Sequence, residues 1–422
     1  MLLFYGYLYF VYMLKKNAKS IINKRSHVLI ATFSPWKNGV RLPINGNLEP
    51  MRDYFVPRVK KVVLIDQVYP GSDFVLPRVE VYEYGKFVSF LKSSFIVTIL
   101  SPLLWFSNTS GTHIVFKMRD YLSVIVEGLR TNKPFDFFVG FEAINALAGV
   151  FLRRFGRVKK VVYYVSDYSP DRYRQKWFND LYLWLDRQAA MHADIIWDVS
   201  PAMQPARVKA GLDQTKSASV IIVPNALYPR QICALPINQI ERHTLVFMGT
   251  LGVENGPDVA ITAMLHILKR ISDAKLHIVG GGTDEQRLKH LAQSLRVEHA
   301  VTFHGFVADR EKVSALIRKY QVAVAPYKYI HGSARLYGDA TKIRAYMAAG
   351  LPTVTTSVPP LGKLIAQLGA GSIVGDSPEE LAREVVQLFL NKEQYVRMRR
   401  AAFKFAKKNT WDNEYQKAIE AS

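Results

Sequence analysis

The feature that most constrains this fold is the regular alternation of short β-branched or aromatic runs with longer helical stretches. Such alternation is typical of βαβ units, which build parallel sheets. In the first half, helices are predicted around 142–155 and 172–192. The first half is therefore predicted to form one doubly wound domain. Its predicted strands are 27–33, 61–66, 78–83, 135–141, 160–166 and 194–200.

The pattern breaks at 220–236 and then begins again. A strand there runs into a segment that contains three prolines, which is the composition expected of an interdomain linker. Beyond it, the alternation predicts a second Rossmann-like domain. Its predicted strands are 243–249, 275–281, 300–305, 322–327, 351–356 and 371–375. Its predicted helices lie near 257–271, 283–296, 309–320, 339–349 and 378–390.

The predicted domain boundaries follow from this reading. A tail at 1–26 precedes a first Rossmann-like domain at 27–226, and a linker at 227–242 leads to a second Rossmann-like domain at 243–410. A helix at 411–422 is placed last, where it could return to the first domain. The predicted fold class is α/β, with two Rossmann-like doubly wound domains that face each other across a crevice.

Composition agrees with two packed domains and suggests an anionic partner. A chain of 422 residues with 49% hydrophobic residues can fill two cores. The single cysteine, Cys233, excludes an internal disulfide and fits a reducing cytoplasm. The net charge of +21 implies nucleic acid, an anionic membrane surface or phosphorylated substrates as partners.

Two apolar segments raise the question of membrane association. The stretch at 1–13 is too short to span a bilayer, so it is either a shallow anchor or a disordered tail. The stretch at 87–106 contains Lys92 and Pro102, which disfavour a transmembrane helix. A buried core helix and a helix in the membrane interface are the other two readings.

Glycines follow two strands of the second half. Gly249 and Thr250 open a turn whose backbone N–H groups can face a phosphate, although an ordinary strand-to-helix turn explains them equally well. Gly281 and Gly282 belong to a triple glycine, but the third glycine of a dinucleotide fingerprint would fall at Glu285. A dehydrogenase is therefore disfavoured, and these glycines indicate a crevice without naming its occupant.

The most informative stretch is 325–356, where a strand leads through a polar loop into a helix that begins near Asp339. Free N–H groups at the helix start, with Thr341 and Lys342 in its first turn and Arg335 in the loop before it, predict a diphosphate site. Each basic residue alone is better explained as a solvated surface charge. Their combination with the helix start is what predicts the site.

These residues resemble a known family, the GT-B glycosyltransferases, especially the group with bacterial polysaccharide and lipid glycosyltransferases. KIRAYMAAGLPTVTT resembles the family string K-L-x-E-Y-M-A-x-G-x-P-V-V, and KLHIVGGG and VTFHGFV resemble strands and loops around the nucleotide. The resemblance is strong over 243–410 and weaker over 27–226. It implies a metal-independent hexosyltransferase that uses a nucleoside-diphosphate sugar as donor substrate and needs no cofactor.

The sequence also departs from the family pattern. Two glutamates seven residues apart are replaced by Tyr337 and Ala345, and an Arg and a Lys after the first strand of the second domain by Thr250 and Asn255. The usual ribose and diphosphate contacts are therefore altered. The expected donor-binding residues are Gly249, Thr250, Gly281, Gly282, Arg335, Asp339, Thr341 and Lys342.

On the acceptor side, two carboxylates follow predicted strands. Asp167 is the first choice for the catalytic residue and Glu142 the second, since both would point into the interdomain crevice. In relatives, the loop after the strand that corresponds to the one before Asp167 carries a His or Asp that acts on the acceptor or on the developing positive charge. Either carboxylate could instead cap the helix that follows it.

The expected function is transfer of a sugar from a nucleoside-diphosphate sugar to a lipid-linked or saccharide acceptor by a protein bound peripherally to the inner face of the cell membrane. No spacing of His, Cys or Glu predicts a metal site, since His304 and His331 stand isolated. The alternative is a basic nucleic-acid-binding protein or a non-catalytic nucleotide-sugar-binding protein, but no basic run interleaved with aromatics supports nucleic acid. The sugar, the nucleotide and the stereochemistry are left open.

Overall fold

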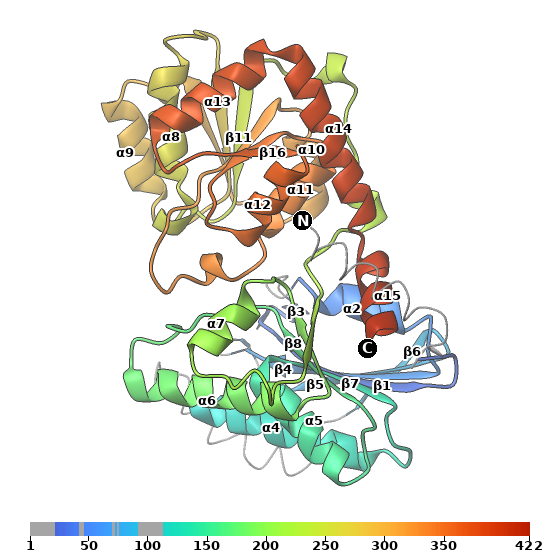
Figure 1. Ribbon diagram of the computed structural model, residues 1–422. Helices are drawn as coiled ribbons and strands as arrows, with labels where there is room; N and C mark the ends of the chain where they lie inside the picture. The colour runs from blue at the N-terminus through green and yellow to red at the C-terminus, as the bar shows by residue number, and fades with distance from the viewer. Residues whose placement is uncertain (1–21, 42–45, 70–71, 74–75, 92–112) are drawn as a thin grey trace.

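The computed structural model describes residues 22–41, 46–69, 72–73, 76–91 and 113–422. Two α/β domains lie one above the other, and the chain crosses between them near residue 226 and again near residue 410 (Figure 1). Each domain is built on its own sheet. This arrangement confirms the α/β prediction of two sheet-based domains.

The N-terminal domain contains an eight-stranded sheet in the order β10-β9-β8-β7-β1-β4-β5-β6. The strands from β10 to β4 are parallel, and their buried hydrophobic runs agree with a sheet covered on both faces. The strands are β1 (His27–Ser34), β4 (Lys61–Val68), β5 (Arg78–Glu83), β6 (Lys86–Leu91), β7 (Phe137–Phe141), β8 (Val161–Val165), β9 (Ile195–Asp198) and β10 (Ser219–Ile222). A separate ribbon pairs β2 (Trp36–Lys37) with β3 (Val40–Arg41).

One edge of this sheet differs from a doubly wound domain. β5 runs antiparallel to β4, and β6 runs antiparallel to β5. β4 ends at Val68 and β5 begins at Arg78. A parallel crossover needs a dozen or more residues, usually with a helix, so this short connection returns the chain antiparallel.

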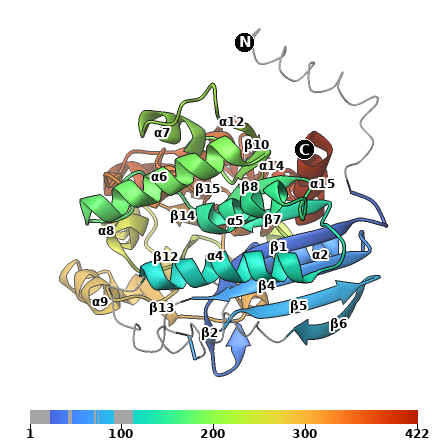
Figure 2. The same ribbon diagram turned by 90° about the horizontal axis from the view of Figure 1, so that it is seen from below.

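Helices cover both faces of the N-terminal sheet. The helices of this domain are α2 (Leu48–Phe55), α4 (His113–Arg130), α5 (Glu142–Arg154), α6 (Lys176–His192) and α7 (Met203–Lys209). α5 lies between α4 and α6 and packs against both, so that the three helices form a layer on one face (Figure 2). α2 lies on the opposite face (Figure 1).

The C-terminal domain has a six-stranded parallel sheet in the order β13-β12-β11-β14-β15-β16. The order reverses direction at β11, which is the switch point where such sheets open a crevice. The strands are β11 (Thr244–Met248), β12 (Lys275–Val279), β13 (Val301–Gly305), β14 (Val322–Ala325), β15 (Thr353–Thr355) and β16 (Gly371–Ile373). The helices are α8 (Pro257–Ile267), α9 (Glu285–Ser294), α10 (Arg310–Ile317), α11 (Thr341–Ala348), α12 (Pro360–Gln367), α13 (Pro378–Leu390) and α14 (Lys392–Lys408).

The last helix, α15 (Trp411–Ala421), packs on the N-terminal domain although it follows the C-terminal one. It contacts α2, and its Tyr415 is buried between the rings of Trp411 and Trp197, with centroid distances of 5.4 and 6.3 Å. The backbone N–H of Trp411 donates to the carbonyl of Leu227 in the linker. The two crossings between the domains are therefore tied to each other.

The apolar segment at 87–106 does not begin as a helix. Residues 87–91 belong to the edge strand β6, where Phe87, Val88 and Phe90 are exposed. All three helical readings of the segment are therefore wrong for its first five residues, because pairing with β5 takes up their backbone groups. Residues 92–106, like the tail at 1–21, lie outside the described residues. Within the described part of the chain, no helix is long and apolar enough to cross a membrane.

Candidate functional site

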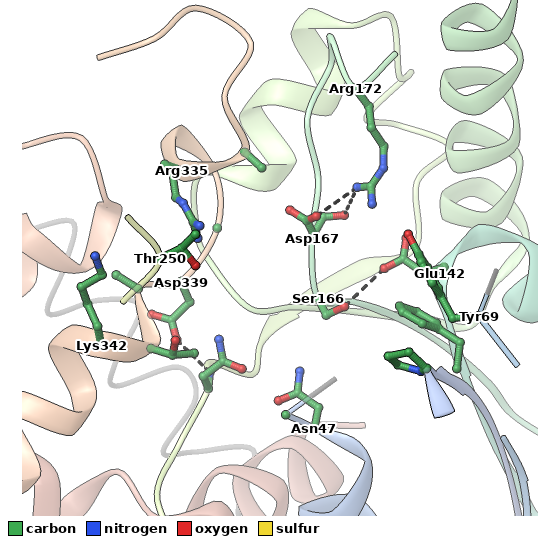
Figure 3. Close-up of a pocket in the computed structure, with 18 of the residues that line it drawn as sticks. Asn47, Tyr69, Glu142, Ser166, Asp167, Arg172, Thr250, Arg335, Asp339 and Lys342 are labelled. Carbon is green, nitrogen blue, oxygen red and sulfur yellow. Dashed lines mark hydrogen bonds and ion pairs between the residues drawn. The ribbon is translucent and has the colours of Figure 1, made fainter. Parts of the chain in front are cut away.

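A cleft of about 2000 Å³ lies between the two domains. Its N-terminal wall includes the residues that follow β7 and β8, and its C-terminal wall includes the loops that follow β11, β12 and β14. Figure 3 shows polar side chains that face the cleft from both walls. The N-terminal wall carries Glu142, Ser166, Asp167 and Arg172, and the C-terminal wall carries Thr250, Arg335, Asp339 and Lys342.

Two glycine-containing loops form the floor of the C-terminal wall. Gly249 has a φ of 131° and donates its N–H to the carbonyl of Val279. Gly280 has a φ of 150°, and a Cβ there would lie 1.9 Å from the carbonyl oxygen of Gly249. Both positions favour glycine because of their positive φ, and a side chain at Gly280 would also separate the two loops. The close approach leaves a surface made mainly of backbone.

Lys342 lies directly against this floor. Its side chain is buried, and a Cβ on Gly249 would come within 3.1 Å of its Cε and Nζ. Nζ donates to Oδ1 of Asn255 at 3.3 Å and lies 4.6 Å from the ring centroids of both Phe247 and Tyr327. The aromatic faces supply cation–π attraction but no counter-charge.

Among the described residues, no carboxylate pairs with the ammonium group of Lys342. Burial, together with the charge of Arg335 and against the opposing charge of Glu254, lowers the pKa of Lys342 from its ordinary value of 10.5 to about 7. Burial favours the neutral amine because the charged form loses its hydration. A buried, cleft-lining lysine whose pKa is strongly lowered is a candidate functional group.

A second cation lies at the mouth of the cleft. Arg335 belongs to the short helix η6 (Ala334–Leu336), and its Nε donates to Oε1 of Glu254 at 3.2 Å. Ser333 donates to the other carboxylate oxygen at 3.0 Å. Glu254 thus holds the polar loop over the cleft. Arg335 is half-exposed, so it can exchange this surface pair for a ligand at low cost.

Asp339 lines the cleft but its carboxylate binds protein groups. It accepts two hydrogen bonds from Arg344, at 2.6 and 3.0 Å, and one from the backbone N–H of Asn225 at 2.9 Å. A carboxylate would repel a diphosphate in any case. Asp339 therefore connects the segment before α11 to Asn225 of the N-terminal domain, and its role in donor binding stays a prediction.

The remaining donor-side residues divide into two groups. Thr250, Gly281 and Thr341 line the cleft, and Thr341 is the first residue of α11, whose free N–H groups point toward anions. Gly282 is absent from the described lining, and a Cβ there would lie 2.6 Å from the carbonyl oxygen of Leu251. Gly282 therefore permits packing behind the cleft surface.

Glu142 has an unusual backbone on the acceptor side. It follows β7 directly and has a φ of 64°, a left-handed conformation that costs a non-glycine residue roughly 1–2 kcal/mol. Such strain is concentrated at functional sites. The carboxylate points into the cleft and accepts a hydrogen bond from Ser166 at 3.3 Å (Figure 3).

Asp167 and Arg172 form an ion pair beside Glu142. The distance from Nη1 of Arg172 to Oδ2 of Asp167 is 3.2 Å. Burial raises the pKa of Glu142, the charge of Arg172 lowers it, and that of Asp167 raises it. Two carboxylates and one guanidinium therefore share this wall, and burial is the largest influence on the carboxyl group of Glu142.

The loop after Asp167 reaches the opposite domain. The hydroxyl of Ser169 donates to the carbonyl of Gly332 at 2.6 Å, and the rings of Tyr168 and Tyr337 meet edge to face at 6.1 Å. The predicted acceptor loop therefore touches the polar loop that carries Arg335. These contacts close one end of the cleft.

Several cleft residues were missed by sequence reasoning. Asn255 accepts a hydrogen bond from Lys342, and Glu254 accepts one from Arg335. Arg172 forms an ion pair with Asp167. Phe306 exposes 79% of its surface beside Gly281. Phe306 directly follows the β13 strand, and its exposed ring offers a stacking surface for a planar ligand. Its position directly after a predicted strand could have identified Phe306 as a cleft residue. Nothing in the local sequence distinguishes Arg172 from other surface arginines.

A search for groups of three or more His, Cys, Asp or Glu residues able to hold a metal ion finds none in the described part of the chain. The prediction of no resident cofactor stays a prediction.

Comparison with known proteins gives one family match. Residues 237–405 match the family model described as "Glycosyl transferases group 1". Over 211 residues, the chain is 28% identical to a GDP-mannose-dependent alpha-(1-6)-phosphatidylinositol dimannoside mannosyltransferase of Mycobacterium tuberculosis. That alignment covers 47% of this chain and 51% of the relative, so the chain spans about half the length of this curated relative.

Two solved structures share the fold over nearly the whole chain. HepE from Anabaena in complex with UDP superposes with a TM-score of 0.65 at 13% identity, covering 94% of this chain and 99% of HepE. Sucrose-phosphate synthase from Thermosynechococcus elongatus gives a TM-score of 0.65 at 13% identity, covering 94% and 100%. At this identity the likeness establishes the fold, which is the predicted GT-B fold.

Lys342→Met should stabilise the protein while it removes anion binding. Because folding lowers the pKa of Lys342 from 10.5 to about 7, the unfolded chain binds more protons between these values, and this lysine costs stability below about pH 10. We expect the free energy of unfolding at pH 7 to rise by about 1 kcal/mol. The gain should shrink as the pH rises toward 10, as measured by urea denaturation.

Lys363→Met is the matched control, since Lys363 is an exposed lysine on α12 in the same domain. It should leave both stability and the thermal shift produced by UDP or GDP unchanged. A loss of stability in Lys342→Met at pH 7 would contradict the conclusion that burial of the Lys342 ammonium group destabilises the folded state.

Proposed function

We propose, because residues 237–405 belong to the glycosyl transferases group 1 family and the described chain has the GT-B fold, that this protein transfers a sugar from a nucleoside-diphosphate sugar to an acceptor. The observation that carries the proposal is Lys342, a buried cation without a bound carboxylate at the start of α11. The C-terminal wall would hold the donor and the N-terminal wall the acceptor.

The donor diphosphate would lie over the glycine floor. The N–H groups at the start of α11 and the ammonium group of Lys342 would bind its oxygens, and Arg335 would leave Glu254 to bind it from the mouth. Phe306 would stack on the base. In this arrangement Lys342 and the helix dipole stabilise the charge on the departing nucleoside diphosphate, so the reaction would need no metal or other cofactor.

Glu142 and Asp167 would act on the acceptor. The strained backbone and raised pKa of Glu142 favour it as the group that accepts a proton from the acceptor hydroxyl. The ion pair of Asp167 with Arg172 would then provide the charges next to the Glu142 carboxylate. The sequence favours Asp167 over Glu142 as the catalytic residue. The backbone conformation of Glu142 supports the opposite choice.

For the acceptor, we propose a lipid-linked saccharide or related lipid. The matched mannosyltransferase of Mycobacterium tuberculosis is named for a phosphatidylinositol dimannoside, and the chain carries a net charge of +21. We further propose that it works peripherally at the cytoplasmic face of the membrane. The layer of α4, α5 and α6 exposes Met118, Phe155 and Trp177, which suit contact with a bilayer surface.

Binding of a nucleoside diphosphate should be coupled to proton uptake. At pH 8 the free Lys342 is mostly neutral, because its pKa is about 7, and the bound diphosphate should recharge it. We expect uptake of most of one proton per UDP or GDP bound at pH 8, and a decline of affinity as the pH rises above 7. Calorimetry in buffers with different ionisation enthalpies measures this uptake.

In Lys342→Met the proton uptake should disappear along with most of the affinity. Tight binding of UDP and GDP by this variant, with unchanged uptake, would contradict the proposed donor site. A panel of UDP- and GDP-sugars in the same calorimetric experiment would identify the donor.

The two carboxylates should give different pH profiles when each is replaced by its amide. Glu142→Gln should lower kcat by about 100- to 10,000-fold, as expected for loss of a general base. Asp167→Asn should move the acidic limb of the rate profile to lower pH, because Asp167 raises the pKa of Glu142. The measurement is the initial transfer rate against pH with the donor found above.

The opposite result has a clear meaning. If Asp167→Asn abolishes transfer at every pH while Glu142→Gln keeps it, Asp167 is the catalytic residue and Glu142 is a strained structural residue. Donor affinity should be unchanged in both variants, which separates a chemical defect from a folding defect.

The membrane proposal predicts salt-sensitive binding to anionic vesicles. The protein should sediment with phosphatidylglycerol vesicles at low salt and be released as salt rises, because charge attraction is screened within about 10 Å at 0.1 M. Equal binding to neutral phosphatidylcholine vesicles, or no binding to either, would count against it.

A further inference from the structure

The interdomain cleft continues into the N-terminal domain as an apolar groove along the seam between α5 and α6. On α5 the groove is lined by Ile144, Leu147 and Phe151, and on α6 by Leu181, Trp184 and Leu185. Spacings of three and four residues place each set on one face of its helix. The two faces turn toward each other, and the groove begins where Glu142 starts α5.

The groove runs most of the length of α5. Both Glu142 and Arg154 line the same cavity, and twelve residues of helix rise about 18 Å. The far end is polar, where Arg154 meets Gln188 and His192 of α6. An apolar channel of this length, with a reactive carboxylate at one end and solvent-facing polar groups at the other, is unlike an ordinary helix seam, which is filled by its own side chains.

The packing of α5 against α6 restricts the occupant of the groove. The two helices contact each other directly along the seam. A peptide helix has a diameter of about 10–12 Å and does not fit between two helices that already touch. A single hydrocarbon chain does, since it presents only methylene or methyl groups to apolar walls.

Charge near the inner end suits an anionic link between the reacting group and such a chain. Arg172 and Lys117 both line the cavity, and both lower the pKa of Glu142 by their charge, which places them near it. A phosphate that joins a sugar to a lipid chain would pass between these cations on its way from the carboxylates into the groove.

We propose that the α5–α6 groove binds the hydrocarbon chain of an amphiphilic acceptor whose reacting end lies at Glu142 and Asp167. This rests on the proposed function, and it specifies the acceptor as a lipid with its chain seated in the protein. The layer of α4, α5 and α6 faces outward on one side of the domain, so a chain can enter it from a membrane surface (Figure 2). Burial of the hydrocarbon chain against the apolar side chains of the groove breaks no polar contacts and is favoured by the hydrophobic effect.

The test compares two exposed tryptophans on the same helix. Trp184 lines the groove and exposes 50% of its surface, whereas Trp177 exposes 60% and is not part of the lining. Both can be replaced by serine with little effect on folding. The probe is dansylamino-undecanoic acid, an anionic hydrocarbon chain whose fluorescence rises on burial.

We expect saturable binding of the probe to the unchanged protein and an increase in Kd of about tenfold in Trp184→Ser, since a buried aromatic contact contributes more than 1.4 kcal/mol. Trp177→Ser should bind as the unchanged protein does. Leu147→Gln on the facing wall should weaken binding in the same direction. Equal Kd values in the two tryptophan variants, or no saturable binding to the unchanged protein, would overturn the proposal.

Nucleotide binding in the same samples separates this idea from the proposed function. The thermal shift produced by UDP or GDP should be the same in all three variants, because Trp184, Trp177 and Leu147 lie on the N-terminal wall or outside the cleft. If the probe binds selectively but UDP and GDP produce no thermal shift, the groove proposal is supported and the glycosyltransferase proposal is refuted. If UDP or GDP produces a thermal shift but the probe does not bind selectively, the groove proposal is refuted and the proposed function is supported.

Discussion

The site depends on a lysine that is held in charge-poor surroundings. Lys342 is buried beside two aromatic rings and against a backbone floor, where its ammonium group donates a hydrogen bond to the amide oxygen of Asn255. Its first-turn position on α11 adds the helix dipole to the same small volume. An anion at this point is attracted strongly because little water screens the charge. A side chain at Gly249 would crowd this lysine, because a Cβ there would lie 3.1 Å from its Cε and Nζ.

The second constraint is that both walls must face each other. Asp339 ties the start of α11 to the linker through Asn225, Ser169 ties the acceptor loop to Gly332, and α15 returns to the N-terminal core. These contacts join segments that are far apart in the chain. Any change in the angle between the domains must break or rearrange them, so donor occupancy and cleft geometry are coupled through the same residues.

The carboxylates of the acceptor wall illustrate how environment assigns roles to similar groups. Glu142 is half-buried and strained, and Asp167 is paired with an arginine at the surface of the cleft. The difference comes from position alone, since both follow parallel strands in the same sheet. In our proposal, the groove that starts at Glu142 binds the hydrocarbon chain of the acceptor.

The sequence by itself determined the two sheets, the linker and the strand ends that carry the cleft residues, because hydrophobic alternation encodes local structure and parallel strands place their carboxyl ends at one edge. It also predicted Lys342, Arg335, Glu142 and Asp167 as site residues, and the structure places all four in the lining of the cleft. Only the tertiary structure decided that the Asp339 carboxylate binds Arg344 and Asn225, that Gly282 packs against Leu251, that β5 and β6 are antiparallel, and that Glu142 is strained. These features arise from contacts between residues up to 114 positions apart, such as Asn225 with Asp339, and local patterns contain no information about such pairs.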